Sequence, residues 1–212
     1  MITVLIPTIG TKHLKQAILS VLDQSVEARP WVIVDGEEHW HTASNAAISD
    51  IWDERGAECI NLTVLPENTH QGVHFGHRIH AAFTHLVNTE HIAYLDEDNW
   101  YQPDHLESLL NLKAGIACSY RGLYDQDGKF IKDDLMDSCG PKSNYQGEFF
   151  TDTSCWLFRT KVAVQFAHAW NLSLPAPGGR TFSDEVYTTY GAVGCTYQPT
   201  LCYRTRPGAW LV

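Results

Sequence analysis

Three consecutive acidic residues, Asp96, Glu97 and Asp98, follow the apolar run HIAYL at 91–95. In an extended chain, side chains two residues apart leave the same side, so the carboxylates of Asp96 and Asp98 can face one ligand. Such oxygens suit Mg²⁺ or Mn²⁺, which takes one or two carboxylates and completes its shell with substrate phosphates. The alternative is a solvated acidic turn before the next helix. The position at the end of an apolar strand favours the metal site.

Another acidic residue, Asp35, follows the apolar run WVIV at 31–34 and precedes Gly36. Its carboxylate could accept a hydrogen bond from a sugar hydroxyl or from the N–H of a nucleobase. Taken alone, the Asp-Gly pair fits an ordinary turn better. Both interpretations stay open on residue types alone.

The stretch NTHQGVHFGHRIHAAF at 68–83 places two glycines before a predicted helix. A glycine-containing loop that leads into a helix exposes backbone N–H groups suited to phosphate, and Arg78 would lie near the first turn of that helix. The same stretch contains His70, His74, His77 and His80. A histidine metal site is the less favoured interpretation, because no cysteine or carboxylate joins them at ligand spacing.

Two further acids, Asp184 and Glu185, lie in FSDEVYTTY at 182–190, at the predicted start of a helix. The helix dipole favours acids there without any function. Either carboxylate could instead be a general base that deprotonates an acceptor hydroxyl. Arg204 and Arg206 share one face of the last predicted strand, where they could meet a phosphate or remain surface charges.

Alternating strands and helices would position these residues. In the first half of the chain we predict strands at 2–7, 31–36, 59–66 and 91–96, and helices at 14–22, in 43–55, at 75–88 and after Pro103. Each strand is apolar throughout, which is typical of a parallel sheet covered on both faces. Ligands bind such sheets beyond the carboxyl ends of the strands, where Asp35 and Asp96 lie. Thr11 is the predicted N-cap of the first helix.

The second half of the chain is less regular. Strands are predicted at 115–125, 129–134, 153–159 and 196–206, and helices at 160–170 and 183–193. Ser183 is the predicted cap of the last helix. No repeat, linker or low-complexity segment interrupts the chain. We therefore predict one domain, 1–212, with an α/β fold: a Rossmann-like, three-layer α/β/α sandwich with a mostly parallel central sheet.

Composition excludes several classes of protein. The 212 residues include 15 Lys and Arg against 25 Asp and Glu, a net charge of −10. This charge argues against broad binding to nucleic acid or to anionic membranes. No leader follows Met1, and no apolar run approaches the roughly 20 residues that span a bilayer. Six cysteines without a CxxC pattern indicate reduced thiols in a cytoplasmic protein.

Together the motifs resemble glycosyltransferase family 2, inverting nucleotide-sugar transferases of the GT-A fold. The segment at 4–25, VLIPTIGTKHLKQAILSVLDQS, is similar to the first strand, Pro-Thr pair and helix of the family. VIVDG at 32–36 is similar to the strand whose Asp contacts the nucleoside base. GHRIHAAF at 76–83 resembles the helix after the glycine loop, and YLDEDNWYQPDHL at 94–106 resembles the metal-binding Asp-x-Asp segment. The resemblance covers about 1–112.

The resemblance implies roles for residues of the first half. Pro7 and Thr8 would border the nucleoside pocket, and Asp35 would contact the base. Arg78 would lie near the nucleotide. The metal-binding segment would act through two residues: Asp96 would contact ribose or metal, and Asp98 would hold Mn²⁺ or Mg²⁺.

In the second half, the resemblance implies that Asp184 and Glu185 are the acidic pair that contains the catalytic base. Glu185 aligns with the position of the usual base of the family, and Asp184 remains the alternative. The chain departs from the family at Asn99, where an Asp is frequent, and no histidine follows His168. The late histidine ligand of the family is therefore absent or replaced.

The implied function is metal-dependent, inverting transfer of a sugar from a nucleotide-diphosphate sugar, most commonly a UDP-sugar, to an unknown acceptor hydroxyl. The acceptor would be a glycan, lipid or small molecule, and the chain could form a homo-oligomer. Residues 1–112 would be the nucleotide-binding half and 113–212 the acceptor-side half. One alternative is a catalytically silent nucleotide- or glycan-binding domain. Another is a sugar nucleotidyltransferase, for which PTIGTKHLK at 7–15 has too few glycines.

Overall fold

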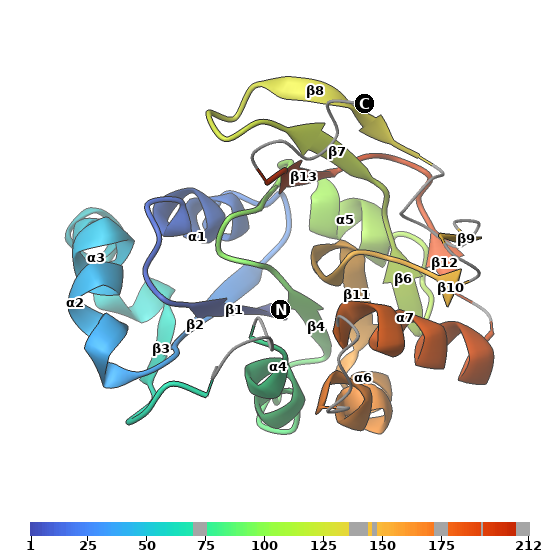
Figure 1. Ribbon diagram of the computed structural model, residues 1–212, viewed down its shortest axis with the longest axis horizontal. Helices are drawn as coiled ribbons and strands as arrows, with labels where there is room; N and C mark the ends of the chain where they lie inside the picture. Colours follow the sequence, from blue (N-terminus) through green and yellow to red (C-terminus); the bar gives the residue numbers. More distant parts are fainter. Residues whose placement is uncertain (70–75, 136–143, 146–147, 172–177, 192, 207–212) are drawn as a thin grey trace.

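A mostly parallel central sheet organises the chain. The computed structural model describes residues 1–69, 76–135, 144–145, 148–171, 178–191 and 193–206. Within these residues the central sheet has seven strands in the order β12-β6-β11-β4-β1-β2-β3 (Figure 1). They are β1 (Ile2–Thr8), β2 (Ala28–Val34), β3 (Asn61–Val64), β4 (His91–Tyr94), β6 (Ile116–Cys118), β11 (Trp156–Arg159) and β12 (Gly194–Cys195). Only β11 runs against its neighbours, β4 and β6. The predicted sheet is confirmed.

Helices cover both faces of this sheet. Figure 1 shows α1 (Leu14–Leu22) and α5 (His105–Leu110) on one side, and α4 (His77–Thr84), α6 (Thr160–Phe166) and α7 (Gly178–Thr189) on the other. Two short helices, α2 (Trp40–Ala43) and α3 (Ser49–Arg55), add their buried residues to the same hydrophobic cluster as α1. The molecule is therefore the predicted three-layer α/β/α sandwich. No helix of the described residues is long and apolar enough to cross a membrane.

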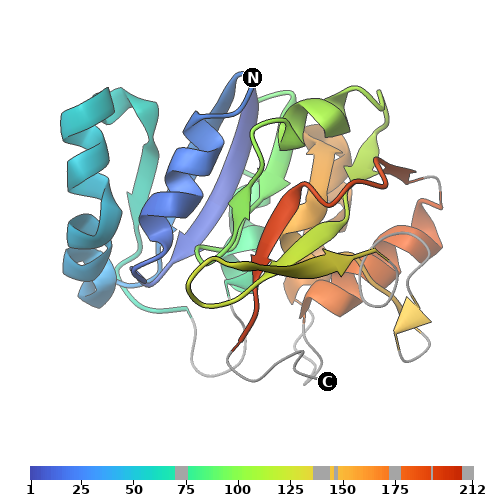
Figure 2. The same cartoon turned by 90° about the horizontal axis from the view of Figure 1, so that it is seen from above.

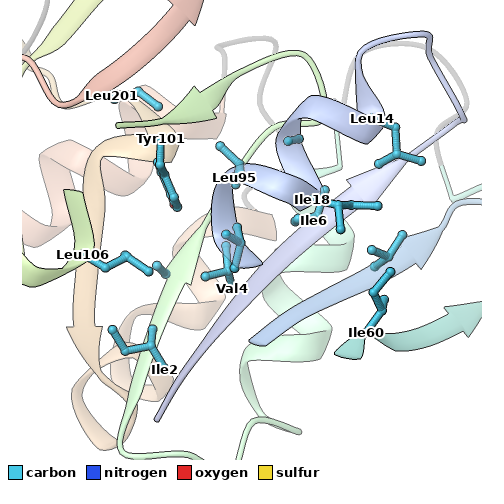
Figure 3. Packing of buried hydrophobic residues seen from close by; sticks show 14 of the residues in the cluster. Ile2, Val4, Ile6, Leu14, Ile18, Ile60, Leu95, Tyr101, Leu106 and Leu201 are labelled. Carbon is cyan, nitrogen blue, oxygen red and sulfur yellow. The ribbon is translucent and has the colours of Figure 1, made fainter. Parts of the chain in front are cut away.

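The alternation of side chains along β1 supplies both cores. Ile2, Val4 and Ile6 belong to the cluster that contains α1 and α5, and Leu5 belongs to the cluster that contains α4, α6 and α7. Figure 3 shows Val4 between Leu106 and Ile6, with Ile6 next to Ile18 of α1 and Ile2 beside Leu106 of α5. Because successive strand residues face opposite sides, a strand that is apolar at every position must be covered on both faces.

A smaller sheet crosses in front of the central one, as Figure 2 shows. Within the described residues its order is β5-β13-β7-β8. The strands are β5 (Trp100–Tyr101), β7 (Arg121–Tyr124), β8 (Phe130–Asp134) and β13 (Leu201–Arg204). A further hairpin pairs β9 (Asn144–Tyr145) with β10 (Glu148–Phe149). Strand β13 brings the end of the described chain beside the segment that follows β4.

The strand predicted at 115–125 is wrong as a single element. It is divided into β6 and β7, which belong to different sheets. The division falls at Ser119, whose N–H donates to the carbonyl of Cys155, and at Tyr120, whose N–H donates to the carbonyl of Gln198. The two halves therefore pair with strands that lie far away in sequence, which local composition does not reveal.

Both predicted helix caps are also wrong. The N-cap of α1 is His13 and makes no side-chain cap bond, so Thr11 does not cap that helix. Ser183 lies inside α7, which begins at Gly178. Its hydroxyl donates to the carbonyl of Thr151 and accepts from the N–H of Thr151. Ser183 therefore joins α7 to the segment before β11.

A buried aromatic layer holds the end of β4. The hydroxyl of Tyr101 donates to the carbonyl of Tyr94 at 2.7 Å. The ring of His105 stacks on that of Tyr101 with 4.0 Å between centroids, and its Nδ1 lies 2.8 Å from Oγ1 of Thr200. Burial lowers the pKa of His105 to about 3. The chain leaving β4 is thus fixed by groups that are neutral at physiological pH.

We predict that His105 makes the fold acid-sensitive. Its pKa of about 3 in the folded chain lies below the value of about 6.5 expected in an unfolded chain. Between these values the unfolded chain binds more protons, so stability falls as the pH falls. Between pH 7.5 and 5.5 the wild type should lose about 1.4 kcal/mol more unfolding free energy than His105→Asn. Urea unfolding at both pH values measures this, and equal losses would contradict it.

Candidate functional site

A cavity of about 360 Å³ opens at the carboxyl ends of β1, β2 and β4. Five of the residues predicted for the site line it, namely Pro7, Thr8, Asp35, Asp96 and Asp98. Its wall also includes Glu97 and, from the strand end at β13, Tyr203, Arg204 and Arg206. Acids and arginines far apart in sequence therefore face one space.

The register of the parallel strands brings the predicted residues together. Thr8 of β1 is opposite Val34 of β2, so Asp35 comes next to the end of β1. Leu5 is opposite Tyr94, and the N–H of Leu95 donates to the carbonyl of Leu5. The acidic segment therefore starts beside the same end of β1.

Asp35 is held firmly and is only 3% exposed. Its Oδ1 accepts from the N–H of Thr69 at 2.7 Å, and its own N–H donates to the carbonyl of Thr8. No described residue donates to its other oxygen, Oδ2. A carboxylate oxygen at a cavity wall can accept a ligand N–H or O–H.

Carboxylates are crowded at the end of β4. Burial, with repulsion from Asp152, Asp98 and Glu97, raises the pKa of Asp96 well above its usual range. Burial within the cavity wall, with repulsion from Glu97, raises the pKa of Asp98 to about 6. Negative charge here is incompletely compensated by the protein, and a bound cation would relieve the repulsion.

The donor set fits a divalent ion only in part. No group of three or more His, Cys, Asp and Glu side chains in the described part of the chain is arranged to hold a metal. Asp96 and Asp98 supply two carboxylates, which is enough for Mg²⁺ or Mn²⁺ when substrate phosphates complete the shell. The residues therefore fit an ion that is shared with a phosphorylated ligand.

Arg204 holds the acidic segment against β13. Its Nε donates to the carbonyl of Asp98 at 3.1 Å, and its Nη2 donates to Oε1 of Gln16 at 2.7 Å. Its backbone N–H donates to Oδ1 of Asn99, and its guanidinium lies 4.8 Å from the ring centre of Trp100. Asn99 therefore has a structural role, because its side chain bonds the backbone of β13. The last strand contributes Arg204 to the segment that contains Asp98.

A buried ion network lies behind the cavity, and the sequence did not reveal it. Nη1 of Arg121 lies 2.8 Å from Oδ2 of Asp152, and Nη2 of Arg121 lies 2.8 Å from Oδ2 of Asp134. All three side chains are at most 8% exposed. The guanidinium also packs on the ring of Tyr203, 4.4 Å from its centre, and Tyr203 lines the cavity. Only the contact of β7, β8 and the segment before β11 brings these charges together.

The other predicted residues lie away from the cavity lining. Arg78 is on the exposed side of α4, where its Nη1 donates to the carbonyl of Thr69, and it lines a different surface groove with His168. On α7, Asp184 is exposed, and Oε1 of Glu185 lies 3.9 Å from Nε2 of His168. The structure thus brings Pro7, Thr8 and Asp35 together with the metal candidates Asp96 and Asp98, and it leaves Arg78 and the two base candidates apart from them.

The histidines near α4 do not form a metal cluster within the described residues. His77 lines the cavity and stacks on Trp170. His80 is completely buried between Tyr94 and Trp170, and burial lowers its pKa well below the usual range. His70, His74 and Gly72, the first glycine of the predicted loop, lie outside the described residues. The second glycine, Gly76, directly precedes α4 with a φ of +76° and lines the cavity.

Comparison with known proteins gives a likeness in structure and none in sequence. No family model matches the chain, and no curated protein matches it. The structure of S. aureus TarS 1–349 in complex with UDP-GlcNAc superimposes with a TM-score of 0.66 at 12% identity, over 98% of this chain and 59% of that one. The complex of TarS 1–349 with UDP gives 0.64 at 11% identity, over 97% and 61%. S. aureus TarS itself gives 0.63 at 11% identity, over 97% and 37%.

This likeness shows the fold. The chain has the architecture of these TarS structures, in agreement with the GT-A-like fold that the motifs predicted. It spans about 59% of the length of TarS 1–349.

We predict that Arg121→Met destabilises the fold by about 3 kcal/mol or more, because it leaves two buried carboxylates without their cation. The matched control is Arg159→Met. Arg159 is 43% exposed in its pair with Glu90, so the control should cost no more than about 1 kcal/mol. Urea unfolding of both variants measures the difference, and equal losses would show that the buried network is not stabilising.

Proposed function

We propose that the chain is a glycosyltransferase that moves a sugar from a nucleotide-diphosphate sugar to a hydroxyl of a glycan, lipid or small-molecule acceptor. The observation that carries the proposal is the single cavity in which Asp35, the acids after β4 and two arginines meet. Ligands of open α/β sheets bind at this end of the strands. The TarS structures with UDP-GlcNAc and with UDP support a UDP-sugar as the first donor to test.

The chain's own residues would orient the donor from both sides of the cavity. Pro7, Thr8 and Asp35 would border the nucleoside, with Asp35 accepting from the base. Arg206, exposed at the wall, would donate to phosphate oxygens, for which a guanidinium is well shaped. In this arrangement the diphosphate lies near Asp98.

Asp98, with Asp96, would hold Mn²⁺ or Mg²⁺. When bound, such an ion neutralises charge on a diphosphate leaving group. The two carboxylates bind it only when ionised, and their crowding is the property that favours a cation. Asp35, on the neighbouring strand, keeps its hydrogen bond to Thr69 and stays with the nucleoside.

Inversion at the sugar requires a base on the acceptor side. Glu185, or else Asp184, would accept the proton of the acceptor hydroxyl while the acceptor oxygen attacks the anomeric carbon and the nucleotide leaves. Neither carboxylate lines the donor cavity, so the choice between them rests on the family resemblance alone.

We predict that UDP with Mn²⁺ stabilises the wild type against heat, by about 2.7 kcal/mol at 100 times the dissociation constant. A thermal-shift screen of UDP, GDP and their sugars, each with and without Mn²⁺, measures this. Asp98→Ala should lose the part of the shift that needs Mn²⁺ and should lose donor turnover.

The control is Asp104→Ala. Asp104 is an exposed acid that precedes α5 and does not line the cavity, so this variant should behave as the wild type does. If Asp98→Ala kept both its donor turnover and its affinity for Mn²⁺, the proposed role of the acidic segment would be wrong.

We predict that one of Glu185→Gln and Asp184→Asn lowers kcat by about 10²- to 10⁴-fold, as loss of a general base does, while the affinity for UDP stays the same. The other variant is the matched control, because it removes the neighbouring carboxylate on the same helix. Steady-state kinetics and UDP titration give both quantities. If both variants kept full kcat, neither residue would be the base.

A second function, nucleotide binding without transfer, is favoured by the position of Asp184 and Glu185 outside the cavity lining. A silent domain would bind UDP-sugars and release no free UDP, either to water or to acceptors. Following UDP release in the presence of Mn²⁺ separates the two functions.

A further inference from the structure

Glu97 stands between the two candidate metal ligands, yet its carboxylate binds the turn that follows β1. Its Oε2 accepts from Oγ1 of Thr8 at 2.5 Å and from the N–H of Thr11 at 2.9 Å. Its Oε1 accepts from the N–H of Ile9 at 3.1 Å. Three donors from four consecutive residues thus converge on one side chain about ninety positions away in sequence.

The turn is closed by a further bond and by close packing. The N–H of Gly10 donates to Oγ1 of Thr8 at 2.8 Å, so this hydroxyl both accepts and donates. Gly10 has a φ of +80°, and a Cβ there would come within 2.4 Å of the backbone nitrogen of Ala43. Only glycine fits this position without displacing α2. The direction of the converging N–H groups is therefore fixed by the bond to Thr8 within the turn and by the packing of Gly10 against α2.

Converging backbone N–H groups form an anion-binding concavity. In this chain the anion is the carboxylate of Glu97, so the turn does not present these donors to a ligand phosphate. Three residues of the turn, Thr8, Ile9 and Thr11, line the cavity together with Pro7. The bonds of Glu97 consequently set the shape of the wall on the nucleoside side.

We propose that Glu97 is a positioning residue for the donor: it fills the turn after β1 with the chain's own carboxylate and holds that wall in the geometry that binds the nucleoside. This role rests on the proposed function. Under this proposal Glu97 has a different role from its two neighbours. Both carboxylate oxygens of Glu97 bind the turn, whereas the carboxylates of Asp96 and Asp98 would hold a cation. Fixing the wall before binding removes an ordering cost from nucleotide binding.

Three variants test the proposal. Glu97→Gln keeps the size of the side chain and replaces one acceptor oxygen by a donor. Glu97→Asp keeps the charge and shortens the reach. Glu107→Gln is the matched control, since Glu107 is an exposed acid on α5 whose carboxylate accepts only from Oγ of Ser25 among the described residues.

The measurements are calorimetric titration with UDP, with and without Mn²⁺, and hydrogen exchange at the amides of residues 9–11. Both Glu97 variants should bind UDP about tenfold more weakly, by the same factor with and without Mn²⁺, because charged hydrogen bonds are lost from the wall. Exchange at residues 9 and 11 should become at least about tenfold faster. Donor KM should rise with kcat nearly unchanged, and Glu107→Gln should match the wild type in every quantity.

Each contrary result has a distinct meaning. Wild-type UDP affinity in Glu97→Gln overturns the positioning role, and so does wild-type affinity in Glu97→Asp, which would show that charge acts without geometry. A loss confined to the titration with Mn²⁺ would make Glu97 a metal ligand and also overturn the proposal. Failure of the wild-type chain to bind UDP or GDP would instead overturn the proposed function. In that case, an unchanged rate of amide hydrogen exchange at residues 9 and 11 in Glu97→Gln would also show that Glu97 does not hold the turn.

Discussion

Repulsion among the carboxylates at the end of β4 is the constraint on which the rest of the site depends. Asp96, Glu97 and Asp98 are consecutive, and Asp152 lies close enough to raise the pKa of Asp96 further. In a partly buried space, each additional like charge costs more than it would in water. The surrounding structure is arranged so that some of these charges are neutralised and others are left unpaired.

The chain divides the four acids between two tasks. The carboxylate of Glu97 accepts hydrogen bonds from N–H groups of the turn after β1, and the carboxylate of Asp152 forms an ion pair with Arg121. Burial and repulsion from the neighbouring carboxylates keep the pKa values of Asp96 and Asp98 above the usual range. A surplus of negative charge facing a cavity is the condition under which a divalent ion bridges protein and phosphate.

What the sequence predicted follows from local rules, and what it missed follows from long-range pairing. Apolar strands with acids at their carboxyl ends place Asp35 and Asp96 correctly, since parallel neighbours end at the same edge. The network of Arg121, Asp134 and Asp152 depends on contacts among three separate elements, so no spacing reveals it. For Glu97 the types and order of residues gave no sign that the middle acid would turn toward the segment after β1.

The most direct test of the account is the linkage between Mn²⁺ and UDP. If Asp96 and Asp98 hold an ion that shares its shell with a substrate diphosphate, the ion and the nucleotide should each strengthen the binding of the other by the same factor. Titration of the wild-type chain with Mn²⁺, followed by the signal of free Mn²⁺ in paramagnetic resonance, should show binding that tightens at least about tenfold when UDP is present. Equal Mn²⁺ affinity with and without UDP would contradict the account, because the crowded acids after β4 would then not share a cation with a nucleotide.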